Sequence, residues 1–385
     1  MTPPLVVAHL YGHPLHVGGV ETHLLSLVAH GDPACFRHVV LAPASPSFTE
    51  RAESLGATVI PWRPVHALDL TALPSLLSHL REEGAGVLHL HSARPLVVAR
   101  WAASTLRLPS VMTIHLPLHA VGGRTGWLAS AKGRAYLWAE RRLAKGFPDR
   151  IIHVARSSLD QARVLGLAPP GRTVLVENGV AASPPFEAGR GRTLRTSMGV
   201  APGAPVVVCV ARLDPQKGVD VLLDAIAGLG PEHRAAHFWL IGGGPRRASL
   251  ERRARRLRLG ERVRFLGFRS DVASLLAASD FFVLPSRAEA LPLSLVEAMT
   301  AGLPCVVTDV GDAGRLVEEA SCGMVVPPGD VVALARALER TLIDRGRWNA
   351  MGAAGSRRAA SLTAAEMARG VEAVYRSLFP GTEGS

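Results

Sequence analysis

The chain has 385 residues, 48% hydrophobic and 19% charged, which is typical of a globular protein with a large core and room for two domains. No run of about 18 apolar residues occurs, which argues against a transmembrane helix, and the first ten residues lack a basic leader and a cleavage site. The net charge of +11 favours anionic partners such as nucleic acid, anionic lipid or an acidic substrate. The four cysteines (Cys35, Cys209, Cys305 and Cys322) have no metal-type spacing, so we expect reduced core thiols in a cytosolic protein.

The first half of the chain alternates short apolar strands with helical segments such as Val20–Ala29 and Leu70–Glu83. Continuous apolar strands separated by helices predict a parallel sheet that is covered on both faces. Ligands of such sheets bind outside the carboxyl ends of the strands, so the residues that follow each strand are the first candidates for a site. The predicted strands are Leu5–Leu10, His38–Leu41, Thr58–Ile60, Val87–His91, Val111–His115, Arg150–Val154 and Thr173–Val176.

Glycines and histidines lie at the ends of several of these strands. Gly18 and Gly19 come between the first strand and a helix, where the backbone can approach a phosphate closely. A histidine at a strand end can donate hydrogen bonds near neutral pH, and His89, His91 and His115 all have this placement. We interpret His89 as a buried, hydrogen-bonded core residue, whereas His91 is open between a core and a site role.

Two basic segments account for much of the net charge. Residues 124–149 form a helical pattern with aromatic side chains, which could contact anionic lipid or could be a packed helix with exposed arginines. Residues 246–264 carry nine arginines and two glutamates, a pattern typical of a solvated amphipathic helix. Nucleic acid fits this second segment poorly because it has almost no aromatic side chains for stacking.

A stretch rich in Pro, Gly and small residues, 183–195, predicts the linker between two domains. The N-terminal domain then spans 1–182 and the C-terminal domain spans 196–362, with a last helix over about 363–380. The second domain repeats the alternation of strands and helices, which predicts a second parallel sheet. Its predicted strands are Val206–Val210, His237–Ile241, Val263–Leu266, Phe281–Leu284, Cys305–Val307 and Met324–Val326.

Charged side chains follow two strands of this second sheet. Arg212 and Lys217 lie on the loop that enters the next helix, where they could neutralise a leaving diphosphate. Glu289 lies in a later loop, and Glu297 lies in the helix that begins near Leu293. The start of that helix offers unpaired N–H groups and a positive dipole end, so the two carboxylates could hold hydroxyls on either side of a bound phosphate.

These motifs, together with Gly242-Gly-Gly-Pro245, resemble the donor-binding half of the retaining glycosyltransferases of family 4. The resemblance implies an α/β protein with the GT-B fold, in which two Rossmann-like domains with parallel sheets face each other across a cleft. It also implies that the N-terminal domain binds the acceptor, that the C-terminal domain binds the nucleotide-sugar donor, and that the last helix packs back on the first domain.

The resemblance implies roles for individual residues. His115 would line the reaction centre, Arg212 and Lys217 would hold the diphosphate, Glu289 would bind a hydroxyl of the donor sugar, and Glu297 would bind the ribose. The chain departs from the usual pattern after the histidine, where Leu116-Pro117 replaces Asp or Gly, and at Gly243, where an acidic residue is common. The other residues implied to contact the donor are Gly18, Gly19, Gly242, Gly244, Phe268, Arg269, Ala290, Leu291, Pro292 and Leu293.

We therefore expect a retaining glycosyltransferase that moves a hexose from a nucleoside diphosphate sugar to a saccharide or lipid-linked acceptor. The setting implied is bacterial surface-polysaccharide or glycolipid biosynthesis, in the cytoplasm or at the inner face of the membrane. No Asp-x-Asp motif occurs, so neither a metal ion nor another cofactor is expected. Two alternatives stay open: another GT-B enzyme such as a nucleotide-sugar epimerase, and a non-catalytic basic scaffold for a membrane or a protein partner.

Overall fold

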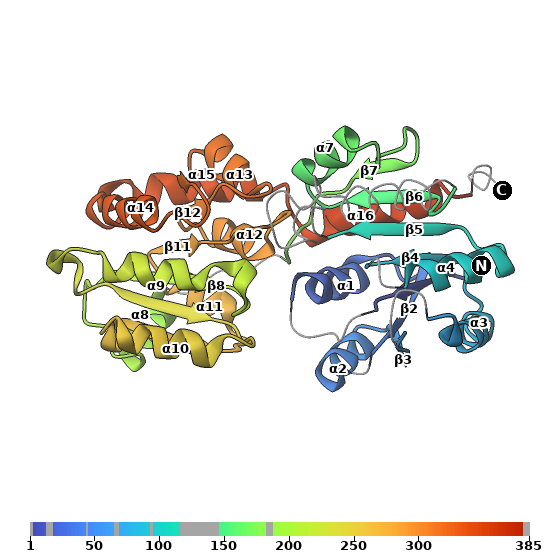
Figure 1. Ribbon diagram of the computed structural model, residues 1–385, viewed down its shortest axis with the longest axis horizontal. Helices are drawn as coiled ribbons and strands as arrows, with labels where there is room; N and C mark the ends of the chain where they lie inside the picture. The colour runs from blue at the N-terminus through green and yellow to red at the C-terminus, as the bar shows by residue number, and fades with distance from the viewer. Residues whose placement is uncertain are drawn as a thin grey trace, which may run out of the picture. The chain divides into compact units, whose positions relative to one another are not determined.

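The structure, a computed structural model, describes residues 3–12, 18–43, 45–64, 69–92, 95–115, 146–181 and 188–379. The chain divides into two compact units: unit 1 is Met1–Ala181 with Ala364–Ser385, and unit 2 is Ala182–Thr363. Each unit is built on a parallel sheet with helices packed against it (Figure 1). This confirms the α/β class and the two Rossmann-like domains that the sequence predicts.

Within its described residues, unit 1 has a seven-stranded parallel sheet in the order β3-β2-β1-β4-β5-β6-β7. The chain runs outward from β1 in one direction and then from β4 in the other, which makes the β1/β4 boundary the topological switch point. The strands are β1 (Leu5–Leu10), β2 (Phe36–Ala42), β3 (Thr58–Pro61), β4 (Val87–Leu90), β5 (Ser110–Ile114), β6 (Arg150–His153) and β7 (Thr173–Leu175). The helices are α1 (Gly19–His30), α2 (Pro46–Ser54), α3 (Leu73–Glu82), α4 (Leu96–Leu106), α7 (Arg156–Val164) and α16 (Ala364–Arg376).

Side chains alternate between the two faces of this sheet because successive residues of a strand point in opposite directions. Ala8 and Leu88 belong to one core cluster, which also contains buried residues of α3 and α4. Val7, Val87 and Val111 belong to another cluster, which contains residues of α1 and α16. The last helix of the chain therefore completes the core of unit 1.

Unit 2 has, within its described residues, a six-stranded parallel sheet in the order β10-β9-β8-β11-β12-β13. Its central strands are buried on both faces, as expected for continuous apolar runs such as Val206–Val210. The strands are β8 (Val206–Val210), β9 (His237–Ile241), β10 (Val263–Gly267), β11 (Phe281–Leu284), β12 (Cys305–Thr308) and β13 (Gly323–Val326). The helices are α8 (Ala188–Ser197), α9 (Val219–Ala227), α10 (Arg247–Arg256), α11 (Val272–Ala277), α12 (Leu293–Thr300), α13 (Ala313–Ala320), α14 (Val331–Ile343) and α15 (Trp348–Ala359).

Two sequence predictions are wrong. The stretch 183–195 is not simply a linker, because α8 begins at Ala188 and belongs to unit 2. Packing outweighs the helix-breaking tendency of its glycines: α8 lies against α11, and Arg195 forms an ion pair with Asp280 at the start of β11. Cys35 is exposed rather than part of the core, whereas the other three thiols are buried and all four are free.

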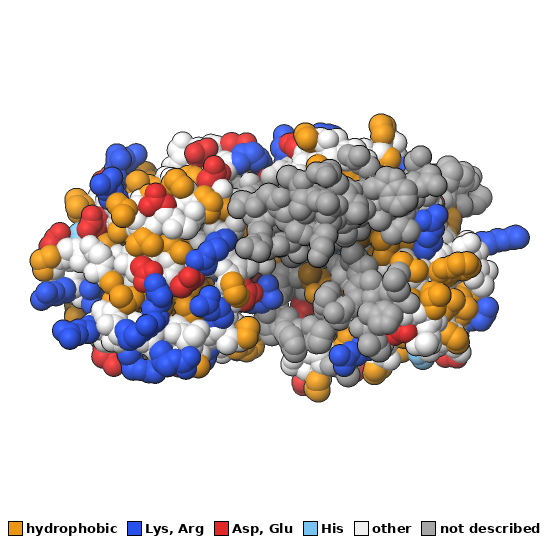
Figure 2. All heavy atoms as spheres, in the orientation of Figure 1, with side chains coloured by type: hydrophobic (Ala, Val, Ile, Leu, Met, Phe, Trp, Pro, Cys, Tyr) orange, Lys and Arg blue, Asp and Glu red, His pale blue; other side chains and the backbone are white. Residues whose placement is uncertain are grey.

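The two basic segments have different outcomes. Residues 124–145 lie outside the described residues, so the prediction for 124–149 is untested. Most of the second segment forms the amphipathic helix α10, whose Leu250 and Ala254 are buried, and its last two residues begin β10. Arg253 pairs with Asp224 on α9, and Figure 2 shows further Lys and Arg side chains over this part of unit 2. No helix in the described ranges is long and apolar enough to span a bilayer.

Candidate functional site

The loops that follow β8 and β11 lie side by side at the switch point of unit 2, because these strands are neighbours in the sheet. Hydrogen bonds join the two loops: the backbone N–H of Arg287 donates to the carbonyl oxygen of Gln216 (2.7 Å), and the Gln216 amide donates to the carbonyl oxygen of Ala288 (2.8 Å). The Arg287 guanidinium also binds both carboxylate oxygens of Asp220 at 2.8 Å. The loops therefore form one rigid surface.

This surface brings together two of the predicted catalytic residues. Lys217 Nζ lies 2.6 Å from Glu289 Oε1, and the Ser286 hydroxyl donates to the same oxygen at 2.6 Å. Both charges are largely buried, since the exposed fractions of the Lys217 and Glu289 side chains are 15% and 6%. The pair sits where the sequence predicts contacts to the diphosphate and the donor sugar.

Backbone donors surround this ion pair. Within the described residues, the N–H groups of 288–291 and of Leu293 have no hydrogen-bond partner, although Ala290 and Leu291 are buried. Unpaired buried N–H groups are rare in proteins, and those at the start of a helix attract anions. The residues predicted to contact the donor, Ala290 to Leu293, thus present the donors that a phosphate or a sugar oxygen would need.

Glu297 lies in the second turn of α12, on the helix that follows these donors. It is half-buried, and among the described residues its carboxylate has no hydrogen bond or ion pair. Burial raises its pKa to about 7. A hydroxyl of a ligand could form a hydrogen bond with this desolvated, unpartnered carboxylate and so stabilise it. The ribose contact of Glu297 stays a prediction.

The remaining predicted side chains of unit 2 are more exposed. Arg212 is 51% exposed and pairs with Asp214 at 2.9 Å, so it is free to move toward an anion at little cost. Phe268 is 59% exposed and follows β10, where an aromatic face is available for stacking. Its neighbour Arg269 binds Asp271 through two hydrogen bonds of 2.7 and 2.6 Å.

The glycines of unit 2 are explained first by contacts between loops. A Cβ on Gly218, which has φ +63°, would lie 2.0 Å from the carbonyl oxygen of Pro285. Gly242 and Gly244 would meet the backbone of the β8 loop in the same way, at Ala211 and Leu213 respectively. These glycines therefore allow the loops to pack together, and their presence alone does not require a phosphate.

In unit 1, Gly18 and Gly19 begin α1. Gly18 has extended backbone angles, and a Cβ on Gly19 would meet nothing within 4 Å, so neither conformation demands glycine. Glu21, in the first turn, accepts a hydrogen bond from the Gly18 N–H as in a capping box. Among the described residues, no atom lies within 4 Å of a Cβ at Gly19, so they leave the start of the helix accessible to a ligand.

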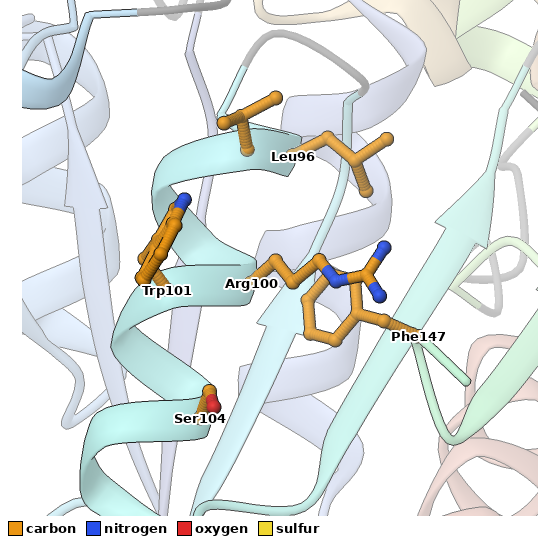
Figure 3. A pocket seen from close by; sticks show the side chains of 6 residues that line it. Leu96, Arg100, Trp101, Ser104 and Phe147 are labelled. Atoms are coloured by element: carbon orange, nitrogen blue, oxygen red, sulfur yellow. The ribbon is translucent and has the colours of Figure 1, made fainter. Parts of the chain in front are cut away.

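A pocket of about 330 Å³ lies on the outer side of α4 (Figure 3). Trp101 and Arg100 line it together with Phe147. Phe147 lies near the start of the described range 146–181. None of the predicted site residues lines this pocket, so we assign it no role.

His115 follows β5 in unit 1 and is half-buried. Its Nε2 lies 3.2 Å from Nδ1 of His91, and its ring meets the ring of His23 edge to face at 4.8 Å between centroids. Burial holds the pKa of His115 well below its usual value, so the ring is neutral at pH 7. Leu116-Pro117, where the chain departs from the family pattern, lies outside the described residues.

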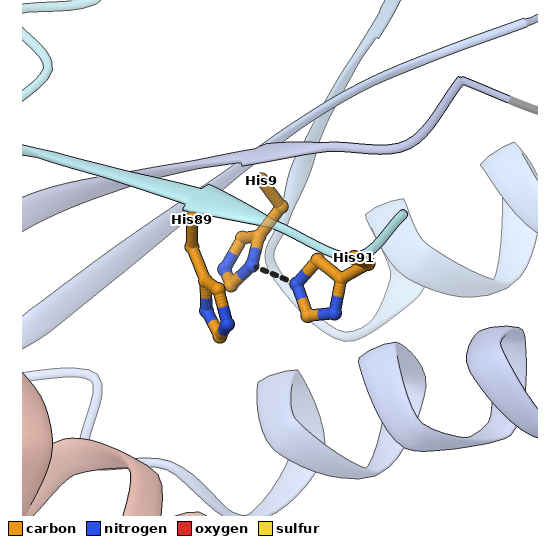
Figure 4. Close-up of side chains that lie close together, drawn as sticks. All are labelled: His9, His89 and His91. Carbon is orange, nitrogen blue, oxygen red and sulfur yellow. Dashed lines mark hydrogen bonds between the residues drawn. The ribbon is translucent and has the colours of Figure 1, made fainter. Parts of the chain in front are cut away.

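A cluster of six histidines surrounds this position. His9 is hydrogen-bonded through its two nitrogens to His91 (3.0 Å) and His38 (2.9 Å), as Figure 4 shows for His9 and His91. His89 bonds Tyr375 (2.6 Å) and Thr113 (2.7 Å), which confirms its interpretation as a satisfied core residue. The cluster, called the histidine cluster below, consists of His9, His23, His38, His89, His91 and His115.

Sequence reasoning missed His9, His23 and His38. The available signal was the alternation of side chains along each strand. His9 has the parity of Val7, and His38 has the parity of Phe36, so both point to the sheet face that α1 covers. His23 lies on α1 itself, which places it opposite the strand histidines.

Comparison with known proteins agrees with this architecture. Residues 18–179 match the family described as glycosyl transferase 4-like domain, and residues 204–344 match the family described as glycosyl transferases group 1. The phosphatidyl-myo-inositol mannosyltransferase of Mycobacterium leprae (strain TN) is 30% identical over 382 residues, which cover 94% of each protein. The UDP-Gal:alpha-D-GlcNAc-diphosphoundecaprenol alpha-1,3-galactosyltransferase of Escherichia coli is 27% identical over 285 residues, or 72% of this chain and 71% of that protein.

A solved structure shares the fold along nearly the whole chain. The crystal structure of Anabaena Alr3699/HepE in complex with UDP-glucose is 23% identical, covers 97% of this chain and 100% of that chain, and has a TM-score of 0.82. Both halves of the chain therefore match glycosyltransferase families in sequence, and nearly the whole chain matches this structure in fold. The chain belongs to the group 1 glycosyltransferases with a 4-like first domain, and it has the GT-B fold of that family.

Proposed function

We propose that this glycosyltransferase is a retaining, metal-independent hexosyltransferase that uses a nucleoside diphosphate sugar. The observation that carries the proposal is the buried pair of Lys217 and Glu289, 2.6 Å apart, beside a row of unpaired backbone donors at the switch point of unit 2. This arrangement offers one cation, one carboxylate and several N–H groups within one rigid surface. A diphosphate joined to a hexose needs the same three kinds of partner.

Each group has a task in this proposal. The Lys217 ammonium and the Arg212 guanidinium stabilise the charge that grows on the leaving diphosphate, which replaces the metal ion that an Asp-x-Asp motif would hold. Glu289 accepts a hydrogen bond from a hydroxyl of the donor sugar, and Glu297 accepts from the ribose. His115, neutral because it is buried, is available to donate to the sugar or the phosphate.

For the stereochemistry, we propose that the acceptor attacks from the face that the diphosphate leaves. A leaving phosphate oxygen then takes the acceptor proton, so the anomeric configuration is retained without a covalent sugar–enzyme bond. Glu289 positions the sugar in this scheme and is not the nucleophile. Its hydrogen bonds from Lys217 and Ser286 support this role, since they hold its carboxylate in place.

We propose a saccharide or lipid-linked acceptor, and hence a role in cell-surface polysaccharide or glycolipid biosynthesis at the inner face of the membrane. Two relatives support this: one is named for phosphatidyl-myo-inositol and the other for a diphosphoundecaprenol-linked sugar. The similar structure in complex with UDP-glucose supports a nucleotide-sugar donor but does not identify the base for this chain.

The first experiment is a thermal-shift screen against UDP, GDP, ADP and their hexose conjugates in the presence of EDTA. A ligand at 100 times its Kd adds roughly 2.7 kcal/mol of stability, so the true donor should stand out. The shift should disappear in Glu297→Ala and persist in Glu318→Ala, which removes an exposed glutamate of α13. No shift with any nucleotide would refute the donor site.

The second experiment measures reaction. With the donor that the screen identifies, release of nucleoside diphosphate should require an acceptor and should continue in EDTA, and nuclear magnetic resonance should show an unchanged anomeric configuration in the product. Conversion of the sugar nucleotide without any acceptor would indicate an epimerase instead. Inversion of the anomeric centre, or loss of activity in EDTA, would overturn the corresponding part of the proposal.

A further inference from the structure

In the described structure, the histidine cluster contains one buried ring nitrogen that has no hydrogen-bond partner. His23 is fully buried, and its Nε2 has no hydrogen-bond partner in the described residues. Its other ring nitrogen, Nδ1, lies 3.0 Å from the amide oxygen Oδ1 of Asn178. An amide oxygen only accepts, so Nδ1 carries the hydrogen and Nε2 presents a bare lone pair to the interior.

Two other imidazoles lie beside the ring of His23. Ligand nitrogens of His23, His91 and His115 all lie within 4.8 Å of one another. The ring centroids are separated by 4.8 Å for His23–His115, 5.5 Å for His91–His115 and 5.7 Å for His23–His91. Three imidazoles around one tetrahedral Zn²⁺, with Zn–N bonds of about 2.0–2.1 Å, have centroids roughly 5 Å apart, so the rings already have close to the required spacing.

We propose that His23, His91 and His115 form a binding site for a divalent transition metal ion, with Zn²⁺ the ion of first choice. Imidazole nitrogen suits Zn²⁺ and its neighbours in the series and does not suit Mg²⁺ or Ca²⁺. The three side chains occupy three positions of a tetrahedron, and the fourth is open to water. The separation of 3.2 Å between His91 Nδ1 and His115 Nε2 is close to the ligand spacing in such a site, about 3.3 Å.

The surroundings of the three histidines match those of metal ligands. Asn178 holds the Nδ1–H of His23, which is the outer-shell contact that fixes the tautomer of a metal-bound histidine. His91 is held in turn through its Nε2 by His9. Burial keeps His23 neutral, with a pKa of about 4, so its nitrogen does not need to lose a proton before it binds. His115, which is only half-buried, gives the ion a way in.

A second triad in the cluster does not meet these conditions. The nitrogens of His9, His89 and His91 are also close together. Both nitrogens of His89 are already occupied, however, by Tyr375 at 2.6 Å and Thr113 at 2.7 Å. A metal there would have to break two buried hydrogen bonds. At the first triad it would replace one hydrogen bond, the 3.2 Å contact between His91 and His115, and it would gain the His23 lone pair that has no partner in the described residues.

The inferred ion goes beyond the proposed function, which needs no metal at the diphosphate. It would occupy Nε2 of His115, a nitrogen that the proposed function leaves free for the donor, so we expect a bound ion to compete with transfer and not to support it. Binding is therefore the quantity to measure, and its failure would leave the donor site untouched.

The test is a titration of the full, tag-free chain with Co²⁺ after treatment with EDTA and desalting. Co²⁺ substitutes for Zn²⁺ and gives intense visible bands only when it is tetrahedral. We expect these bands to saturate at one equivalent, without the near-ultraviolet band of a thiolate ligand, and to disappear on addition of Zn²⁺. Weak octahedral spectra alone, or a thiolate band from the exposed Cys35, would overturn the proposal.

Variants locate the ion. His23→Gln should abolish the tetrahedral bands, whereas His79→Gln, which changes a histidine of α3 outside the cluster, should retain them. Asn178→Ala should weaken binding by about 10- to 100-fold, and Asn178→Asp should not, because a carboxylate holds the Nδ1–H at least as well. If His23→Gln fails to fold, the Asn178 pair and His115→Gln still decide the matter. Equal Co²⁺ binding by the wild type and by Asn178→Ala and His115→Gln would exclude this site.

Discussion

Lys217 and Arg212 carry the same charge and the same proposed task, but their surroundings differ. Lys217 is mostly buried against the buried Glu289, whereas Arg212 is half-exposed beside Asp214. We expect Lys217→Ala and Arg212→Ala each to slow transfer on the order of 10²-fold, because each removes a charge that stabilises the leaving group. Only Lys217→Ala should also lower the free energy of unfolding, by about 3–5 kcal/mol, because it leaves a buried carboxylate unpaired.

Urea denaturation and single-turnover kinetics of the two variants separate these effects. The control is Lys217→Ala combined with Glu289→Ala, which removes both charges. We expect this double variant to regain much of the lost stability while it stays inactive. If Arg212→Ala were the less stable protein, or if both single variants turned over at the wild-type rate, the assignment of the diphosphate site would be wrong.

Glu297 provides a prediction of pH dependence. Burial raises its pKa to about 7, and a ribose hydroxyl donates to the ionised carboxylate more favourably than to the neutral acid. The donor should therefore bind more tightly as the pH rises from about 6 to 8, and the bound hydroxyls should lower the pKa of Glu297. Calorimetric titration with the nucleotide sugar measures this, because its diphosphate diester does not itself titrate in that range.

Glu297→Gln is the matched control, since it keeps the size of the side chain and removes the titration. Its affinity for the donor should be weaker than that of the wild type at pH 8 and should change little between pH 6 and 8. The buried histidines do not interfere, because burial lowers the pKa of His23 and His38 to about 4. A wild-type affinity that fell with rising pH would contradict the ribose contact.

The loops and the helix that carry the candidate donor-site residues were predictable from the sequence because they follow apolar strands. Their pairing was not: Lys217 and Glu289 are 72 positions apart, and only the adjacency of β8 and β11 brings them within 2.6 Å. The histidine cluster was even harder to predict from the sequence. Its members lie in strands, directly after strands or in helix α1, and a single histidine in or beside an apolar strand is indistinguishable from an ordinary core residue.

At the scale of elements, the loops after β8 and β11 depend on one glycine. Gly218 has φ +63°, and a Cβ there would lie 2.0 Å from the Pro285 carbonyl oxygen. We expect Gly218→Ala to cost about 2 kcal/mol or more of stability and to weaken donor binding, because the two loops must separate. Denaturation and donor titration check both effects.

Gly243→Ala is the control for this substitution, since a Cβ at Gly243 meets nothing within 4 Å. It should leave both stability and donor affinity close to those of the wild type. Equal effects of the two substitutions would mean that glycine flexibility, and not the close approach of the loops, is what the site requires.

Strand positions were the most predictable elements, because long apolar runs such as Val206–Val210 and Phe281–Leu284 leave few other choices. Helix α8 was missed because its glycines and arginines give it little apolar periodicity. It is stabilised by contacts that sequence does not display, with α11 and, through Arg195, with Asp280. Local propensity and tertiary packing disagree there, and packing decides the structure.

At the scale of the whole molecule, the two units differ in the number of chain segments that form them. Unit 2 is a continuous stretch, whereas unit 1 takes α16 from the far end of the sequence. Met367, Val371 and Tyr375 of α16 are almost fully buried in the cluster that also contains Val7 and Val111. Unit 1 therefore cannot complete its core until the last residues are present.

A chain that ends at Thr363 should consequently lose unit 1 and keep unit 2. Removal of α16 exposes one apolar face of the first sheet and deprives His89 of its 2.6 Å partner Tyr375, whereas the core of unit 2 and its donor site remain intact. Calorimetry should show one remaining transition, and the donor nucleotide should still raise its midpoint. A chain that ends at Phe379, which retains α16, should behave as the full protein does. If the shorter chain unfolded as the full protein does, α16 would not be part of the core of unit 1. If the shorter chain lost its response to nucleotide, the donor site would depend on more than unit 2.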